Sequence, residues 1–81
     1  MRINVKFFAL LRERAGVSEF TLDLPDGATV GSAREPLLAR FPALREHLTR
    51  CAYAVNRSYA GTDTVLKDGD EMALIPPVSG G

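Results

Sequence analysis

The chain contains 81 residues, among them ten basic and ten acidic side chains that cancel at neutral pH. This balance excludes the strongly basic face with which many proteins bind nucleic acid or an anionic membrane, and it favours a protein partner instead. A domain of this size buries one modest core, so we do not expect a deep active site enclosed by this chain alone.

Cysteine content and hydropathy indicate the compartment. Cys51 is the only cysteine, which excludes an internal disulfide. Residues 1–3 begin a strand-like pattern in place of a signal peptide, and no apolar run approaches the roughly 18 residues of a membrane span. We therefore expect a cytoplasmic protein without membrane contact, in which residues 1–75 form one domain and residues 76–81 form an extended, flexible tail.

Alternating apolar residues predict two strands near the start of the chain. The side chains expected to face the core are Ile3, Val5, Phe7, Phe20, Leu22 and Leu24. Between the two strands, residues 9–15 suit a short helix that ends at Gly16, and Leu10 or Leu11 should return to the core.

The main helix is expected within residues 29–41, but its first residue is ambiguous. Thr29 is one candidate for the N-cap, while Ser32 followed by Glu35 has the pattern of a capping box. Pro36 would cost about 3 kcal/mol in the interior of a helix that began at Thr29, and less in one that began at Ser32. We therefore expect a late start or a kink.

Shorter elements complete the predicted domain. The helix should bury Leu37, Leu38 and Phe41 and end at Pro42. The elements expected after it are a helical turn in residues 43–48, strands within 51–55 and 58–60, a buried pair at Val65 and Leu66, and a last strand over 72–75. This order favours an α+β sheet around one helix, with its first and last strands paired in parallel.

Residues 76–81 have the composition of a tail that another protein could receive. Pro76 and Pro77 stop the last strand because proline has no amide hydrogen, and they favour an extended exit. A segment of this length spans at most about 20 Å. Gly80 and Gly81 lack Cβ atoms and would pass through a narrow channel. The alternative is a frayed chain end without a role.

The residue types that most often perform catalysis are isolated in this sequence. His47 is the only histidine, Cys51 lies in an apolar strand without a second cysteine, and Ser79 has no apparent base partner. A structural role for the first two, and a spacer role for Ser79, is the simpler interpretation. We expect no catalytic acid or base from this chain.

The residues around the last strand are candidates for contact with a partner. Asp68, Asp70 and Glu71 form a short acidic group that lacks the further ligands of a metal site. A solvated turn is the simpler interpretation, and pairing with arginines of a partner is the alternative. Because side chains alternate along a strand, either Leu74 or Ile75 should point away from the core, toward a partner or beneath residues 62–66.

Three blocks spread along nearly the whole chain carry a family likeness. They are Val5-Lys6-Phe7-Phe8-Ala9 with Leu11-Arg12-Glu13, then Ala54-Val55-Asn56, and finally Leu66-Lys67-Asp68-Gly69-Asp70-Glu71 with Pro76-Pro77-Val78-Ser79-Gly80-Gly81. With these blocks the chain resembles the small subunits of molybdopterin synthase, which are related to ubiquitin and to the sulfur carriers of thiamine biosynthesis. The resemblance implies a β-grasp fold, a mixed sheet of four to five strands wrapped around one main helix. Pro36 departs from the pattern expected of that helix.

The resemblance also implies a function for the tail. A separate adenylating enzyme would use ATP and magnesium to activate Gly81, and a sulfur-donor protein would convert it to a thiocarboxylate. The tail, consisting of Pro76, Pro77, Val78, Ser79 and Gly80, would then carry the sulfur into the large synthase subunit. There it would react with cyclic pyranopterin monophosphate, in a heterotetramer of two small and two large subunits. The chain itself would bind no cofactor, metal or nucleic acid.

Three alternatives remain open at the level of sequence. A thiamine-type carrier would share the two closing glycines, although the pair Pro76-Pro77 favours the molybdopterin branch. A ubiquitin-like modifier would use the same adenylate to acylate lysines of other proteins, and this chain offers only Lys6 and Lys67 as internal acceptors. A plain interaction domain would have an inert tail.

Overall fold

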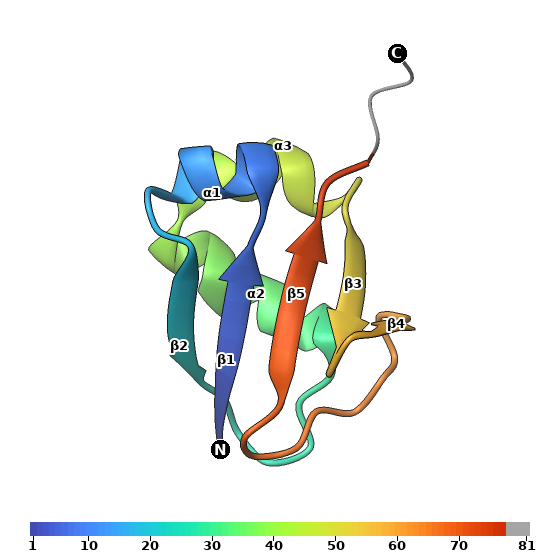
Figure 1. The fold of residues 1–81 in the computed structure, drawn as a ribbon. Helices are drawn as coiled ribbons and strands as arrows, with labels where there is room; N and C mark the ends of the chain where they lie inside the picture. Colours follow the sequence, from blue (N-terminus) through green and yellow to red (C-terminus); the bar gives the residue numbers. More distant parts are fainter. Residues whose placement is uncertain (78–81) are drawn as a thin grey trace.

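The computed structural model describes residues 1–77 and contains a mixed five-stranded sheet with helices, an α+β architecture (Figure 1). In chain order its elements are β1 (Arg2–Phe7), α1 (Ala9–Ala15), β2 (Glu19–Asp23), α2 (Val30–Arg40), the 3-10 turn η1 (Pro42–Leu44), α3 (Arg45–Leu48), β3 (Ala52–Val55), β4 (Ser58–Ala60) and β5 (Glu71–Ile75). The predicted β-grasp arrangement is confirmed, with α2 as the main helix.

The sheet has the strand order β2-β1-β5-β3-β4, so the last strand lies in its middle. β1 and β5 are parallel, with Asn4 opposite Glu71 and Phe7 opposite Leu74, whereas the other pairs are antiparallel. The predicted pairing of the first and last strands is therefore confirmed. Because β1 and β5 run in the same direction, β5 ends at the edge of the sheet where α1 begins (Figure 1).

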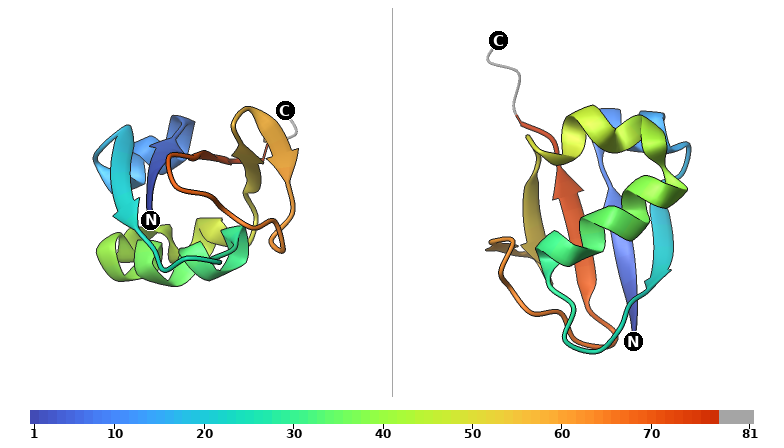
Figure 2. Two further views of the ribbon diagram at one scale, coloured as in Figure 1. Left: turned by 90° about the horizontal axis from the view of Figure 1, so that it is seen from below. Right: turned by 180° about the vertical axis from the view of Figure 1, so that it is seen from behind.

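Helices cover only one face of the sheet. Figure 2 shows α2 lying across one side of the strands, while the other side carries no helix. The core between α2 and the sheet consists of apolar side chains, the largest fully buried ones being Ile3, Val5, Phe7, Leu11, Val30, Leu37, Leu44, Leu48, Leu66, Met72 and Leu74. Within residues 1–77, no helix has the length and apolar character needed to cross a membrane.

The structure tests the predictions made for α1 and for the apolar residues of β2. Of the two leucines in α1, Leu11 is buried and Leu10 points outward. Gly16 ends the helix in the left-handed conformation, at φ 82°, where its N–H donates to the carbonyl of Arg12. Phe20 is only partly buried because it lies on the edge strand β2, where its ring packs edge-on against Phe41 with 5.0 Å between ring centroids.

The start of α2 corrects the sequence prediction. Thr29 is the N-cap, and it exchanges hydrogen bonds with Ser32, so Ser32 completes the capping box instead of beginning one with Glu35. The expected late start is wrong, since α2 runs from Val30 through Pro36 to Arg40. Tertiary packing outweighs the local cost of the proline, which removes one backbone hydrogen bond.

The segment before β5 explains why α2 begins early. The amides of Val30 and Gly31, which no helical carbonyl can satisfy, donate to Thr64 and Thr62 at 3.0 and 2.8 Å. In the same segment Leu66 is buried as predicted, whereas Val65 is exposed. Its burial was wrongly expected, because the extended backbone here turns successive side chains to opposite sides.

The second half of α2 and the turn after it follow the prediction closely. Leu37 is fully buried, while Leu38 and Phe41 are partly buried against the core. Pro42 ends the helix and opens η1, and the expected helical turn in residues 43–48 is formed by η1 and α3.

Candidate functional site

The root of the tail is fixed in the middle of the sheet. Pro76 and Pro77 follow β5 directly and belong to no helix or strand. β5 is hydrogen-bonded on both sides, to β1 and to β3, where Ala52 lies opposite Ile75. The chain therefore leaves the domain from a rigid point. The predicted site residues Val78, Ser79, Gly80 and Gly81 lie outside the described residues.

The two residues expected at the root point to opposite faces of the sheet. Leu74 is fully buried in the core, so its side chain has no surface to offer a partner. Ile75 is partly exposed and lines a hollow on the face that carries no helix. Residues 62–66 pack against the start of α2 instead of covering Ile75. Of the pair, Ile75 is thus the residue that the alternation directs outward.

The uncovered sheet face carries an apolar surface next to this root. We call it the open face and define it by Phe8, Ala54, Tyr59, Ala73 and Ile75, which line a hollow of about 400 Å³ together with Lys6, Arg57 and Glu71. The side chains of Phe8 and Tyr59 are 45% and 80% exposed, large values for aromatic residues. Exposed aromatic surface of this kind is typical of a protein interface.

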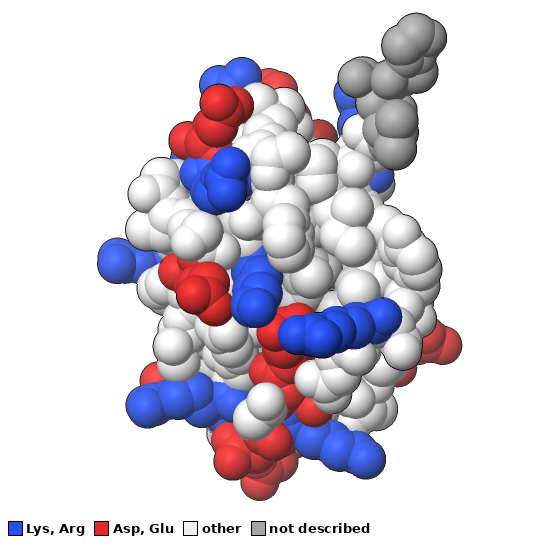
Figure 3. All heavy atoms as spheres, in the orientation of Figure 1, with Lys and Arg blue, Asp and Glu red and all other residues white. Residues whose placement is uncertain are grey.

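Charge is distributed unevenly over the same face. Figure 3 shows uncharged surface over the upper centre and the right side of this face, while acidic and basic side chains lie at its upper left, across its middle and at its lower end. Lys6 and Glu71 project from the neighbouring strands β1 and β5, and their charged atoms lie 3.0 Å apart. The two charges neutralise each other beside the open face, which leaves its centre apolar.

The acidic residues near β5 are engaged separately within the chain. Asp68 accepts a hydrogen bond from the amide of Arg2 at 2.7 Å. Asp70 accepts from the side chain of Asn56 and from the amide of Lys67, at 2.9 and 2.8 Å. Glu71 pairs with Lys6. Residues 1–77 contain no cluster of His, Cys, Asp and Glu that could hold a metal ion. The hydrogen bonds of Asp68 and Asp70 are all exposed, which agrees with the interpretation of the group as a solvated turn, and the turn is held by contacts within the chain.

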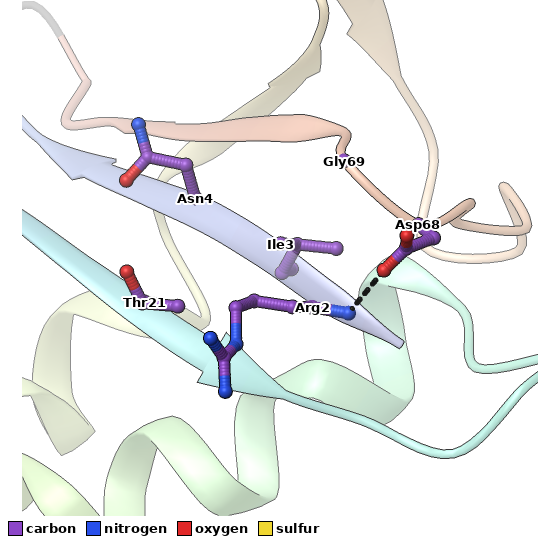
Figure 4. A pocket seen from close by; sticks show the side chains of 6 residues that line it. All are labelled: Arg2, Ile3, Asn4, Thr21, Asp68 and Gly69. Atoms are coloured by element: carbon purple, nitrogen blue, oxygen red, sulfur yellow. Dashed lines mark hydrogen bonds between the residues drawn. The ribbon is translucent and has the colours of Figure 1, made fainter.

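A second hollow lies at the other end of β1, and it contains part of this turn. Figure 4 shows its lining by Arg2, Ile3, Asn4, Thr21, Asp68 and Gly69, with a volume of about 350 Å³. The Arg2 guanidinium donates to Asp23 at 2.9 Å and holds the pKa of that exposed carboxyl below its usual range. The hollow contains no nucleophile or paired acid and base, so we assign it a structural role.

The contacts of Cys51 and His47 indicate structural roles for both residues. The Cys51 thiol lies 3.7 Å from the carbonyl of Leu48, and burial raises the pKa of this thiol, which disfavours the nucleophilic thiolate. The hydroxyl of Tyr53 donates to the same carbonyl at 2.8 Å, and burial likewise raises its pKa. His47 lies in α3, and its main-chain carbonyl accepts from the amides of Arg50 and Cys51. Ser79 lies outside the described residues.

Sequence reasoning missed the aromatic part of the open face. Phe8 and Tyr59 were not singled out, although Phe8 directly follows β1 as the N-cap of α1 and Tyr59 lies in β4, and both are exposed. The signal for Phe8 was present, because it continues the outward series of Asn4 and Lys6. For Tyr59 the signal was absent, since the strand order that places β3, and with it β4, beside β5 is not visible in the sequence.

Comparisons with known proteins show which family the chain is similar to. The model of the ThiS family matches residues 5–81. The molybdopterin synthase sulfur carrier subunit of Chlamydomonas reinhardtii is 45% identical over the full length of both chains. SAMP1, the small archaeal modifier protein 1 of Haloferax volcanii, superimposes with a TM-score of 0.89 at 35% identity, again over the full length of both chains.

A structure of a complex is also similar. One chain of the complex of subunits 1 and 2 of the molybdopterin-converting factor from Helicobacter pylori is 33% identical, with a TM-score of 0.72 over the full length of both chains. Matches of this identity over complete chains establish common descent as well as a common fold. This chain belongs to the ThiS family and, within it, to the sulfur carrier subunits of molybdopterin synthase.

Proposed function

We propose that this sulfur carrier works through Gly81 and delivers its sulfur inside the large subunit of molybdopterin synthase. The observation that supports this most strongly is the place where the tail begins. β5, the middle strand, leads directly into Pro76 and Pro77 beside the exposed aromatic residues of the open face. A partner that binds this face would receive the tail at a fixed position and orientation.

The chemistry requires activation of the terminal carboxylate. A carboxylate is a poor electrophile, so a separate enzyme would use ATP and magnesium to form an acyl-adenylate on Gly81. The outer sulfur of a persulfide on a donor protein would then attack the carbonyl carbon, forming the C–S bond while the C–O bond to AMP breaks. A second thiol would attack the donor's own sulfur, so that the S–S bond to the carried sulfur breaks, a disulfide forms and the thiocarboxylate is released. The resulting thiocarboxylate carries a soft, anionic sulfur that attacks carbon readily, as a thiolate does. Two such deliveries to cyclic pyranopterin monophosphate would complete a dithiolene.

The large subunit would provide the catalytic acid and base for this transfer. Within residues 1–77, the thiol of Cys51 is disfavoured as a nucleophile, and His47 belongs to a helix and not to the open face. This division leaves the small chain two tasks, docking and sulfur delivery. The similarity to one chain of a complex of subunits 1 and 2 supports such a partner, and we extend it to a heterotetramer. Since ATP drives the activation, we place the chain in the cytoplasm.

Reconstitution with two forms of the same chain tests this function. The chain is prepared with a thiocarboxylate at Gly81 and, as a matched control, with the ordinary carboxylate. Each is mixed with the large subunit and cyclic pyranopterin monophosphate, and the dithiolene product is quantified after conversion to a fluorescent derivative. We expect product only from the thiocarboxylate, with two carriers consumed per pterin. The large subunit is first shown to be active with a known sulfur carrier. If this chain then gives no product, the proposal is contradicted.

Protein modification is a second candidate function, and the similarity to small archaeal modifier protein 1 is the observation that favours it. In this case a lysine amine would displace AMP from the same adenylate and form an amide. Extracts of the native cells, blotted for this chain, would contain slower-migrating adducts that survive reducing agents. A carrier that donates only sulfur leaves none. A thiamine-type carrier would instead copurify with a thiazole synthase.

A further inference from the structure

Arg57 occupies a backbone conformation that normally belongs to glycine. It is the second residue of the two-residue loop Asn56-Arg57, which joins β3 to β4 between the paired residues Val55 and Ser58. Both loop residues have positive φ, 50° for Asn56 and 71° for Arg57. Tight hairpin turns with this geometry strongly prefer asparagine followed by glycine. Asparagine therefore fits its position, whereas arginine is strained.

The chain uses glycine at its other tight turns. Gly16, Gly27 and Gly69 have φ between 82° and 87°, and none of them lines the hollow of the open face. Adding a Cβ at these glycines would meet no atom within 4 Å, so backbone conformation alone accounts for them. Among the described residues other than glycine, positive φ occurs at Ala9 (φ 50°), at Asn56 and at Arg57, and of these only Arg57 has a long charged side chain. Backbone strain of this kind clusters at functional sites.

The turn does not need the arginine side chain for its own stability. Asn56 fixes the loop through three hydrogen bonds, from its amide to the carbonyl of Glu71, from its side chain to Asp70, and from the amide of Glu71 to its side-chain oxygen. For the Arg57 guanidinium, residues 1–77 provide neither a hydrogen bond nor an ion pair. The side chain lines the hollow of the open face instead, together with Tyr59 and Ile75.

The charges around this hollow indicate what Arg57 binds. Lys6 is already paired with Glu71 at 3.0 Å, and the two side chains are only 32% and 26% exposed. Arg57 therefore leaves one uncompensated positive charge at the edge of an apolar surface. A guanidinium presents two parallel N–H groups that match the two oxygens of a carboxylate. An acidic side chain of a docked protein complements this arrangement in both charge and shape.

We infer that Arg57 is a specificity-determining residue of the open face and that it binds a carboxylate on the large synthase subunit. The inference rests on the proposed function, because it assumes that the large subunit docks on this face. On this account, arginine is kept at this strained position because its side chain binds the partner. Glycine would relax the turn but remove the only charge on the open face that lacks a partner within residues 1–77.

The variant Arg57→Gly separates binding from stability. Glycine suits the positive φ, so the melting temperature of the free chain is expected to rise by a few degrees. Affinity for the large subunit should nevertheless fall on the order of tenfold at low salt. Calorimetric titrations at two salt concentrations should also show a weaker salt dependence than for the wild type, because one ion pair has been removed.

Two further variants complete the test. Asn56→Gly alters the same turn without touching the hollow, and it should lower the melting temperature while keeping the affinity. Arg57→Lys retains the charge but loses the paired donors, so it should recover only part of the affinity. Wild-type affinity in Arg57→Gly would overturn the inference, as would an equal loss in Asn56→Gly, which would indicate turn shape instead of the guanidinium. If even the wild-type chain fails to bind the large subunit, the proposed function fails as well.

Discussion

Deletion of Gly81 is expected to reduce sulfur transfer to the uncatalysed background and to leave the free energy of unfolding unchanged. In the proposed mechanism the carbonyl carbon of Gly81 is the atom that is adenylated and that carries the sulfur, so the deletion removes the reacting atom. Within residues 1–77 the buried core, in contrast, extends from Ile3 to Leu74. Dithiolene formation in the reconstituted reaction, together with urea denaturation of the free chain, measures both effects.

The variant Ser79→Ala is the matched control for this deletion. It keeps the length and the closing glycines of the tail and removes only the hydroxyl that might otherwise be taken for a nucleophile. Sulfur transfer should remain close to that of the wild type, since the serine is interpreted as a spacer. Residual transfer by the chain without Gly81, or a loss in Ser79→Ala comparable to that of the deletion, would contradict the assignment of Gly81.

The second large effect is expected on the free energy of unfolding when Phe7 is replaced, and a much smaller one when its neighbour Phe8 is replaced. The two side chains point in opposite directions, Phe7 into the core and Phe8 to the open face. Phe7 is 1% exposed and packs edge-on against Phe41, with 5.3 Å between ring centroids. Phe7→Ala should therefore lower the free energy of unfolding by about 3–5 kcal/mol. That is most of the stability expected of a small domain, about 5–15 kcal/mol in total. Phe8 is 45% exposed, and Phe8→Ala should cost less than about 1 kcal/mol.

Binding should show the opposite order for this pair. Phe8 belongs to the open face beside the root of the tail, and truncating an aromatic residue in the centre of an interface costs on the order of 1–2 kcal/mol or more. Calorimetric titration should thus show Phe8→Ala binding the large subunit about five- to thirtyfold more weakly, or weaker still, in a chain that melts normally. Unchanged affinity for this variant would remove the open face as the docking surface.

The fold was predictable because local patterns and tertiary structure agree over most of the chain. Alternating residues such as Ile3, Val5 and Phe7 have the period of a strand, and all three are buried. Gly16 and Pro42 end their helices for reasons that depend only on their own backbone properties. Where neighbouring residues in the sequence decide the conformation, the sequence is sufficient.

Prediction failed where a distant segment decides the conformation. The capping-box pattern at Ser32 is a local signal for a helix that begins there. The helix begins earlier because the carbonyls of Thr62 and Thr64 accept hydrogen bonds from the first amides of α2. Val65 appeared apolar and buried, but its pairing with Thr29 turns it toward solvent. Neither contact has a signature in the residues nearby, since both join positions some thirty residues apart.

The candidate site likewise has one part that the sequence predicts, the tail, and one part that it does not, the open face. The tail and its two closing glycines are a sequence motif and were predicted as such. The open face combines Phe8, Tyr59 and Ile75. Phe8 directly follows β1, and the other two lie in β4 and β5, so the three become neighbours only through the order β1-β5-β3-β4. Likewise, register and not composition decides that Leu74 is buried and Ile75 exposed, because a shift of one residue would exchange them.

The intact mass of the protein purified from its native cells, under reducing and non-acidic conditions, is the most direct test of the sulfur-carrier account. A fraction of the molecules should carry the mass increment of sulfur replacing oxygen, and fragmentation should place that increment at Gly81. If the terminus is always an unmodified carboxylate, even after incubation with the activating enzyme, ATP and the sulfur donor, Gly81 does not carry sulfur and the account is contradicted.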